Sequence, residues 1–139
     1  MNKPLAGIKV VEVSMWAFVP AAGAVLADMG AEVIKIEPPA GDPMRGLTYC
    51  GIAPGTGGFT FLWEIFNRGK RSICIDLKTE AGRAVLRSLA ERSDVLVEGF
   101  RPGVMERLGL GPAECHVQNP GLVYGRMTGW GQQGPLADT

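Results

Sequence analysis

The stretch GAEVIKIEPPAGDPMR, residues 30–45, indicates the type of fold that this chain adopts. Its residues Val33, Ile34 and Ile36 form a short β-branched run, which is typical of a buried strand in a parallel sheet. The strand is expected to end at Glu37, because two prolines follow and proline cannot donate to a strand ladder. A polar loop comes next, and open α/β sheets bind ligands in loops at the carboxyl ends of their strands.

The residues before this stretch predict a strand-helix-strand unit. A strand is expected at residues 8–13, and a helix is expected between Pro20 and Gly30. Proline suits the first turn of a helix, and glycine suits the position just after its end. The residues between them are small and apolar almost throughout, so this helix is expected to be buried against a sheet. Such a unit favours parallel strands joined by a right-handed crossover.

The rest of the chain continues to alternate between strands and helices. Residues 46–58 are expected to form a loop, followed by a short aromatic helix or packed turn. Further strands are predicted at 71–76, 95–98 and 122–127, and helical segments at 59–67, 79–93, 104–108 and 112–117. The predicted fold class is therefore α/β, with a mostly parallel, doubly wound, Rossmann-like sheet. No linker or repeat divides the chain, so residues 1–139 are expected to form a single domain.

The helix predicted at residues 79–93 has the clearest periodicity. At about 100° per residue, its apolar residues share one face and its charged residues share the opposite face. The apolar face consists of Ala81, Val85, Leu86 and Leu89, and the charged face consists of Glu80, Arg83, Arg87 and Glu91. The charged face is expected to be solvated.

The composition excludes several classes of function. Basic and acidic residues balance at fourteen each, whereas non-specific nucleic-acid binding needs a basic excess, so no nucleic-acid partner is expected. Three cysteines without close spacing predict neither a disulfide framework nor a zinc site, and they fit a reducing cytoplasm. The longest apolar stretch, residues 15–27, is too short to span a bilayer, so no membrane partner is expected. His116 is the only histidine, so no histidine-ligated metal site is expected.

A dinucleotide-binding function would suit the fold class, but the first strand-to-helix turn argues against it. That function needs the glycine pattern G-x-G-x-x-G at this turn, so that the backbone can approach a pyrophosphate. Residues 14–20 contain no glycine and two large aromatic side chains. The pattern occurs later at Gly129, Gly131 and Gly134, where either a tight turn or a loop that closes on a ligand fits the sequence. Glu37 is then expected to be a surface or capping carboxylate.

Candidate nucleophiles are few. Cys115 and His116 have the residue types of a nucleophile and its base, but adjacent helical residues diverge by about 100°, so no catalytic pair is expected. Cys50 lies in a glycine-rich loop and is a candidate for an exposed thiol.

Several cations follow the predicted strands. Arg45 comes after the second strand, Lys78 after the third, and Arg101 and Arg107 after the fourth. The carboxyl ends of parallel strands share one edge of a sheet, so these side chains could gather there. Such a cluster could hold phosphate oxygens through charge-assisted hydrogen bonds. Scattered, solvated charges are the alternative interpretation.

Ordered blocks of sequence carry a resemblance to a known family. They are PLAGIKVVE (4–12), LADMGAEVIKIEP (26–38), GDPMR (41–45), NRGKRS (67–72), DLK (76–78), DVLVEGFRPG (94–103), RLG (107–109) and TGWGQQGP (128–135). In these blocks the chain resembles the N-terminal part of the class III coenzyme A (CoA) transferases, the CaiB/BaiF group that includes formyl-CoA and carnitine-CoA transferases. The resemblance implies a CoA-binding α/β domain, shorter than the family's full chains, and an interlocked homodimer.

The resemblance also implies the residues that contact CoA. By motif position these are Trp16, Ala17, Phe18, Pro38, Ile75, Lys78, Gly99, Phe100, Arg107 and Leu108. Lys78 and Arg107 keep cations suited to phosphate, and Phe100 can pack on the adenine. Pro38 departs from the family pattern, because many members have arginine there. The aromatic residues of the first loop are bulkier than the usual residues at those positions.

The activity implied by the resemblance is transfer of CoA between an acyl-CoA thioester and a carboxylic acid. The family uses an aspartate nucleophile that attacks the thioester, which splits the transfer into easier steps. That aspartate is expected beyond Thr139, so no catalytic residue is assigned and this chain alone is expected to be inactive. CoA enters as a substrate, and no covalently bound cofactor is expected. A 2-methylacyl-CoA racemase is the alternative within the family, although the long segment 41–70 favours the transferase. A non-catalytic CoA-binding or interaction module is the alternative of another class.

Overall fold

A computed structural model of the chain describes residues 3–47, 51 and 60–137. Five strands form one sheet in the order β3-β2-β1-β4-β5, and every neighbouring pair is parallel. The strands are β1 (Lys9–Val13), β2 (Glu32–Glu37), β3 (Arg71–Cys74), β4 (Val95–Glu98) and β5 (Val123–Arg126). The helices are α1 (Phe18–Asp28), α2 (Phe61–Asn67), α3 (Glu80–Glu91), α4 (Val104–Arg107) and α5 (Pro112–Gln118), with a short 3-10 helix, η1 (Pro43–Gly46). The predicted α/β class and parallel sheet are confirmed.

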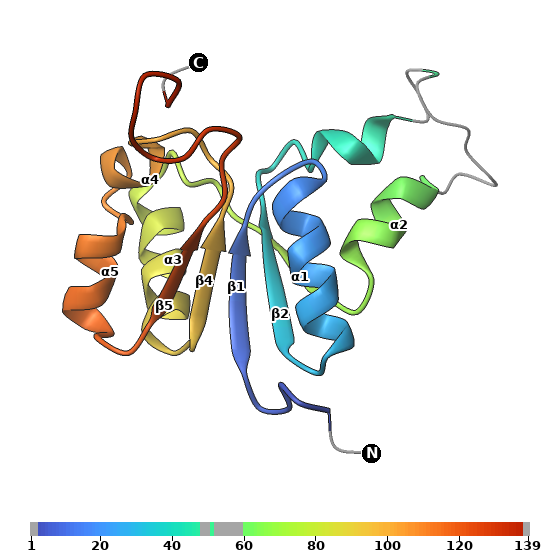
Figure 1. Ribbon diagram of the computed structural model, residues 1–139, viewed down its shortest axis with the longest axis horizontal. Coiled ribbons are helices and arrows are strands. Elements are labelled where there is room, and N and C mark those ends of the chain that lie inside the picture. Colours follow the sequence, from blue (N-terminus) through green and yellow to red (C-terminus); the bar gives the residue numbers. More distant parts are fainter. Residues whose placement is uncertain (1–2, 48–50, 52–59, 138–139) are drawn as a thin grey trace.

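Helices cover both faces of the sheet, as a doubly wound fold requires. Helices α1 and α2 lie on one face, and α3, α4 and α5 lie on the other (Figure 1). Alternate residues of β1 divide between the two layers, because successive strand side chains point to opposite faces. Val11 packs with Leu86 of α3 and Met105 of α4, whereas Val10 packs with Ala27 of α1. The two apolar cores therefore share the central strand.

The strand order reverses direction at β1, the central strand of the sheet. The chain runs outward from β1 to β2 and β3, then returns to place β4 and β5 on the other side of β1. Val13, the last residue of β1, pairs with Ile36 on one side and Glu98 on the other. The loops after these strands therefore start at one level, and such a switch point is the usual ligand crevice of open α/β sheets.

Two local expectations differ from the structure. Strand β3 ends at Cys74 rather than at Asp76, because the carbonyl of Asp76 accepts hydrogen bonds from the backbone N–H and hydroxyl of Thr79 in the turn that starts α3. The buried residues of α3 are Gly82, Leu86 and Ala90. Val85 is 44% exposed, so the helix is rotated toward its small residues relative to the face expected from hydropathy alone. The predicted loop 46–58 and its Cys50 lie largely outside the described residues.

A buried ionic network joins β1, β2 and the segment before β3. Glu12 is fully buried, and its two carboxylate oxygens lie 3.1 Å from Lys35 Nζ and 2.7 Å from Lys70 Nζ. Lys35 also pairs with buried Asp42 at 3.1 Å. Helix α1 packs directly over this network through Gly23, where a Cβ atom would lie only 1.9 Å from Glu12 Oε2. Buried charges are retained in folded proteins when they are paired in this way.

Candidate functional site

A cleft of about 290 Å³ opens at the carboxyl edge of the sheet, at the reversal point. Its walls are mostly apolar and come from the ends of β1, β2 and β3, the loop after β4, and α4. They are formed by Val13, Ser14, Met15, Ile36, Pro38, Ile75, Asp76, Leu77, Lys78, Phe100, Val104 and Leu108. An apolar cleft with a few polar groups at its rim is the usual form of a small-molecule site.

The fold brings half of the predicted CoA contacts into this one cleft. Pro38, Ile75, Lys78, Phe100 and Leu108 all line it, although they come from four separate parts of the chain. Sequence reasoning missed other lining residues, among them the two that directly follow β1. Their position after a strand was a usable signal, since loops at that edge carry ligand sites.

The other predicted contacts lie beside the cleft rather than in its lining. Gly99 and Phe100 border a second hollow of about 130 Å³, together with Arg101 and Trp130. A Cβ atom on Gly99 would lie 2.8 Å from Val19 Cγ2, so glycine allows this loop to approach α1 closely.

The first loop and α4 carry the remaining predicted contacts. Trp16, Ala17 and Phe18 form the end of the first loop and the start of α1, where the two aromatic side chains are 51% and 76% exposed. Arg107 is exposed at the end of α4, directly before Leu108.

The pattern of ion pairs separates structural cations from free ones. Eight of the fourteen basic residues form ion pairs within the described residues, namely Lys35, Arg45, Arg68, Lys70, Arg71, Arg83, Arg87 and Arg126. The basic residues without such a pair are Lys3, Lys9, Lys78, Arg92, Arg101 and Arg107. The first two and Arg92 lie toward the amino ends of the strands. Lys78, Arg101 and Arg107 lie at the carboxyl edge and form no ion pair with a described side chain.

Arg45 is not one of these unpaired cations, although the sequence left open that it would gather with them at this edge. Its guanidinium donates two hydrogen bonds of 2.8 Å to Glu37 and stacks 3.7 Å above the ring centroid of Trp63. Glu37 is only 4% exposed, so the expectation of a surface carboxylate is also wrong. Burial by itself would raise the pKa of Glu37, but hydrogen bonds from Arg45, Ser72 and the Asp42 N–H outweigh burial and lower the pKa to about 2.

Local hydrogen bonds fix the loop that presents Lys78. The backbone N–H of Lys78 donates to Asp76 Oδ1 at 2.9 Å, and Arg83 donates to the carbonyls of Leu77 and Lys78. Thr79 caps α3 by accepting the Gly82 N–H at 3.0 Å. The Lys78 ammonium is left free at the rim of the cleft.

Buried charges also fix the loop that presents Phe100. The Phe100 N–H donates to Glu98 Oε2 at 2.7 Å, and Glu98 is paired with Arg126 at 2.9 Å. Because Glu98 is almost fully buried, the start of this loop is held by a charge-assisted bond.

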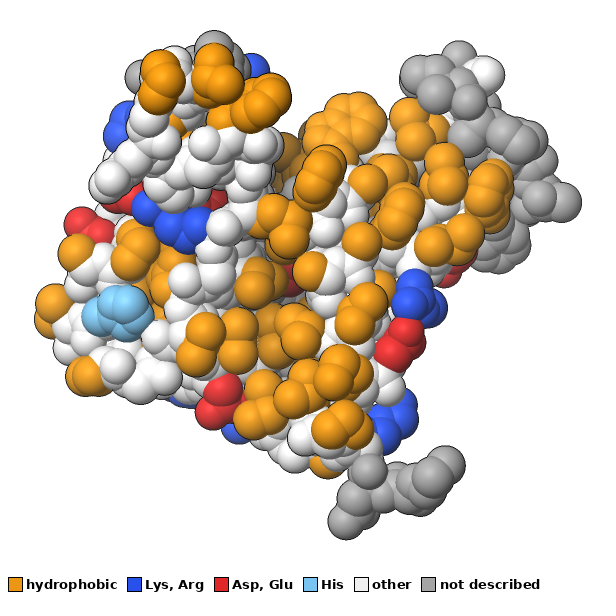
Figure 2. All heavy atoms as spheres, viewed as in Figure 1, with side chains coloured by type: hydrophobic (Ala, Val, Ile, Leu, Met, Phe, Trp, Pro, Cys, Tyr) orange, Lys and Arg blue, Asp and Glu red, His pale blue; other side chains and the backbone are white. Residues whose placement is uncertain are grey.

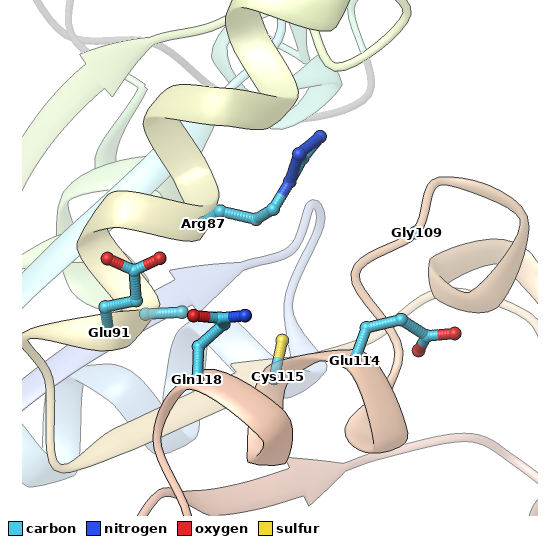
Figure 3. Close-up of a pocket in the computed structure, with 7 residues that line it drawn as sticks. Arg87, Glu91, Gly109, Glu114, Cys115 and Gln118 are labelled. Atoms are coloured by element: carbon cyan, nitrogen blue, oxygen red, sulfur yellow. The ribbon is translucent and has the colours of Figure 1, made fainter.

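The cysteine and histidine of α5 bind different backbone carbonyls. Cys115 Sγ donates to the carbonyl of Leu110, and burial raises the pKa of the thiol. His116 Nε2 lies 2.9 Å from the carbonyl of Leu122. Cys115 borders a cavity of about 10 Å³ between α3 and α5, large enough for roughly one water (Figure 3). Within the described part of the chain, no cluster of His, Cys, Asp and Glu has the arrangement of a metal site.

The late glycine pattern does not form a dinucleotide-binding turn. After β5 the described residues 127–137 contain bends and a turn but no helix. A pyrophosphate site of that type depends on the N-terminus of a helix directly after the glycines.

The fold is thus that of an α/β protein with a mostly apolar cleft at the switch point of its sheet. The sequence model of CoA-transferase family III matches residues 5–139, and the chain belongs to this family.

Individual relatives agree with this assignment. The chain is 44% identical over 133 residues to the probable fatty acyl-CoA transferase Rv3272 of Mycobacterium tuberculosis, covering 96% of this chain and 33% of that protein. A crystal structure of Rv3272 superposes with a TM-score of 0.91 at 42% identity, covering 99% of this chain and 38% of the other. The human alpha-methylacyl-CoA racemase is 44% identical over 130 residues, with coverages of 94% and 29%. The chain therefore spans about a third of the length of these relatives.

Proposed function

We propose that this protein binds coenzyme A in the cleft at the carboxyl edge and serves in transfer of CoA between an acyl-CoA thioester and a carboxylic acid. The observation that carries the proposal is the juxtaposition of the free Lys78 ammonium with the Phe100 ring in one apolar cleft. The membership in CoA-transferase family III supports it. Residues 1–139 would form the single CoA-binding domain of that activity.

The cleft has the size and chemistry for one end of CoA. Its volume of about 290 Å³ lies near the lower limit of the roughly 300–1,000 Å³ typical of ligand pockets, so it would hold the adenosine end rather than the whole CoA molecule. The base would pack on Phe100 and Leu108, and Lys78 and Arg107 would attract the phosphates. Trp16, Ala17, Phe18, Pro38, Ile75 and Gly99 complete the proposed set of contacts.

Catalysis would need a nucleophile, and the described residues of the cleft offer one candidate carboxylate. A carboxylate can attack a thioester because thiolate is a good leaving group, and the resulting covalent intermediate divides the reaction into two steps. Asp76 is the one carboxylate in the cleft lining, and its Oδ1 already accepts the Lys78 N–H. No catalytic residue is therefore assigned among residues 1–139.

A racemase acting on 2-methylacyl-CoA esters is the second candidate, favoured by the human relative of that name. The two reactions differ in what is exchanged. A racemase exchanges the proton α to the thioester with solvent, whereas a transferase moves CoA to a free acid. Incubation in D₂O with a 2-methylacyl-CoA ester, with and without an added acid, would separate them. CoA binding without either reaction would support a non-catalytic module.

Calorimetric titration of CoA into the purified protein, in the form that occurs in the cell, tests the proposed site. Lys78→Glu and Arg107→Glu should each weaken CoA binding about 10- to 100-fold, because each removes a charge-assisted bond and adds repulsion. Arg92→Glu is the matched control, since Arg92 is also unpaired but lies at the opposite edge. Equal affinity in all variants would refute the assignment of the cleft.

The proposal also covers the assembly of the protein and its location in the cell. We expect a homodimer, because α1 and α2 expose apolar side chains at Val25, Met29, Phe61 and Ile65, and Figure 2 shows hydrophobic side chains gathered over these helices. Sedimentation equilibrium would test it, and a monomer at all concentrations would refute it.

No helix in the described residues is long and apolar enough to cross a membrane. We expect a cytoplasmic protein, because three cysteines without close spacing predict no disulfide framework. Fractionation of cells would test this location.

A further inference from the structure

The loop between β1 and α1 forms one wall of the cleft, and its backbone is strained. Ser14 and Met15 line the cleft directly. The next residue, Trp16, has a φ of 68° and is the only non-glycine residue with positive φ in the described part of the chain. A bulky side chain disfavours this left-handed conformation, so it persists only where neighbouring groups hold it.

The groups that hold this loop come from β2 and the polar loop that follows it. Asp42 Oδ1 accepts the Trp16 N–H at 3.2 Å and the Met44 N–H at 2.9 Å. Lys35 Nζ donates to the carbonyl of Ser14 at 3.0 Å and pairs with Asp42 Oδ2 at 3.1 Å. Two adjacent peptide groups of the loop are therefore bound by two oppositely charged side chains that are themselves paired.

The position of Asp42 is fixed in turn by its own backbone. Its N–H donates to Glu37 Oε2 at 3.2 Å, and Glu37 is held by Arg45 and Ser72. Asp42 is 2% exposed, so water does not compete for its carboxylate. A hydrogen bond from a backbone N–H to a buried, ionised acceptor is among the stronger ones in proteins.

We infer that Asp42 is a positioning residue, which holds Trp16 in its left-handed conformation and thereby sets the cleft wall formed by Ser14 and Met15. The inference rests on the proposed function for its effect on CoA. It extends that function by assigning a role to a side chain that does not line the cleft. The Asp42 carboxylate, paired with Lys35 and bound to the loop, would not touch CoA itself.

Amide hydrogen exchange and CoA titration together test this role. In Asp42→Ala, the amides of residues 14–18 should exchange about 10- to 100-fold faster, and CoA affinity should fall by a similar factor. Asp94→Ala is the matched control, because Asp94 Oδ2 accepts the Lys9 N–H at 2.8 Å at the opposite edge of the sheet. That control should leave both the exchange of residues 14–18 and CoA affinity unchanged. Asp42→Asn keeps an acceptor oxygen and should retain more of the protection than Asp42→Ala.

A double-mutant cycle with Trp16→Gly distinguishes positioning from a general loss of stability. Glycine adopts positive φ without strain, so removing Asp42 should cost less CoA affinity in the Trp16→Gly background than in the wild type. Equal losses in both backgrounds would overturn the inference. Unchanged exchange at residues 14–18 in Asp42→Ala would also overturn it. If the wild-type protein binds no CoA, the proposed function fails, while the exchange result still decides whether Asp42 holds the loop.

Discussion

Replacement of Gly23 by alanine should destabilise the protein, although alanine is the better helix former. In an exposed helix this change would stabilise by about 1 kcal/mol. Here the new Cβ would lie 1.9 Å from Glu12 Oε2 and 3.1 Å from Lys70 Cε, both in the buried ionic network. The methyl group must either move α1 away from the sheet or displace the Glu12 carboxylate from Lys70.

The loss of stability can be worked out from the displacement of Glu12 from Lys70. Breaking one partner from a buried ion pair costs about 3–5 kcal/mol, and the gain in helix propensity offsets about 1 kcal/mol. The free energy of unfolding of Gly23→Ala should therefore fall by about 2–4 kcal/mol. This is a large part of the roughly 5–15 kcal/mol that stabilises a typical domain.

Urea denaturation followed by circular dichroism measures this loss. Gly46→Ala is the control, because a Cβ atom there meets no heavy atom within 4 Å and the backbone needs no positive φ. Its midpoint should move little. Shortening the acid in the double variant Gly23→Ala/Glu12→Asp should recover part of the loss relative to the sum of the single changes. An increase in stability for Gly23→Ala would refute the close approach of α1 to Glu12.

Three further predictions concern Glu37, Arg45 and Tyr124. Because the pKa of Glu37 is lowered to about 2 from 4.5, its contribution of roughly 2–3 kcal/mol is present above pH 4.5 and is lost as the pH falls toward 2. Glu37→Gln should lack this pH dependence in acid denaturation. Arg45→Lys should cost about 1 kcal/mol, since lysine keeps the charge but loses the paired bonds to Glu37 and the stack on Trp63, and tryptophan fluorescence should change with it. Tyr124→Phe should cost about 1 kcal/mol in urea denaturation, because the Tyr124 hydroxyl donates to the carbonyl of Leu110 at 2.8 Å; an unchanged midpoint would contradict the importance of that bond.

Local patterns predicted the elements well because they depend on neighbours in the sequence. The β-branched run after Gly30 became β2. Gly23, Ala24 and Ala27 lie on the buried face of α1, whereas Val25 is exposed, so this helix is not buried on every side as its composition suggested. The alternation of strands and helices was enough to predict a parallel sheet, since a strand-helix-strand unit has few other solutions. The blocks of family resemblance supplied the candidate CoA contacts, which spacing alone did not provide.

The rotation of α3 and the state of Arg45 were not predictable in the same way. Ala81 and Val85 have the hydropathy of a buried face, but the buried residues are Gly82, Leu86 and Ala90. A Cβ atom on Gly82 would lie 2.1 Å from the Asp76 carbonyl oxygen, so glycine allows the helix to lie close to the turn before it. In the sequence, Arg45 follows a predicted strand just as Lys78 does, so the sequence does not distinguish a paired arginine from a free lysine. Its pairing depends on the depth of Glu37 and the position of Trp63, which only packing sets.

The sequence by itself determined the order of strands and helices, the parallel class of the sheet and the edge at which a ligand site would form. Tertiary structure decided which charges are buried and paired, and which remain free for a ligand. Glu12 and Lys70 are 58 residues apart, yet their side chains meet at 2.7 Å, whereas the Lys78 ammonium forms no ion pair among the described residues. Hydropathy patterns record the local preference for burial. Ion pairing depends instead on distances across the folded chain, because the interaction between charges falls with their separation and rises as water is excluded.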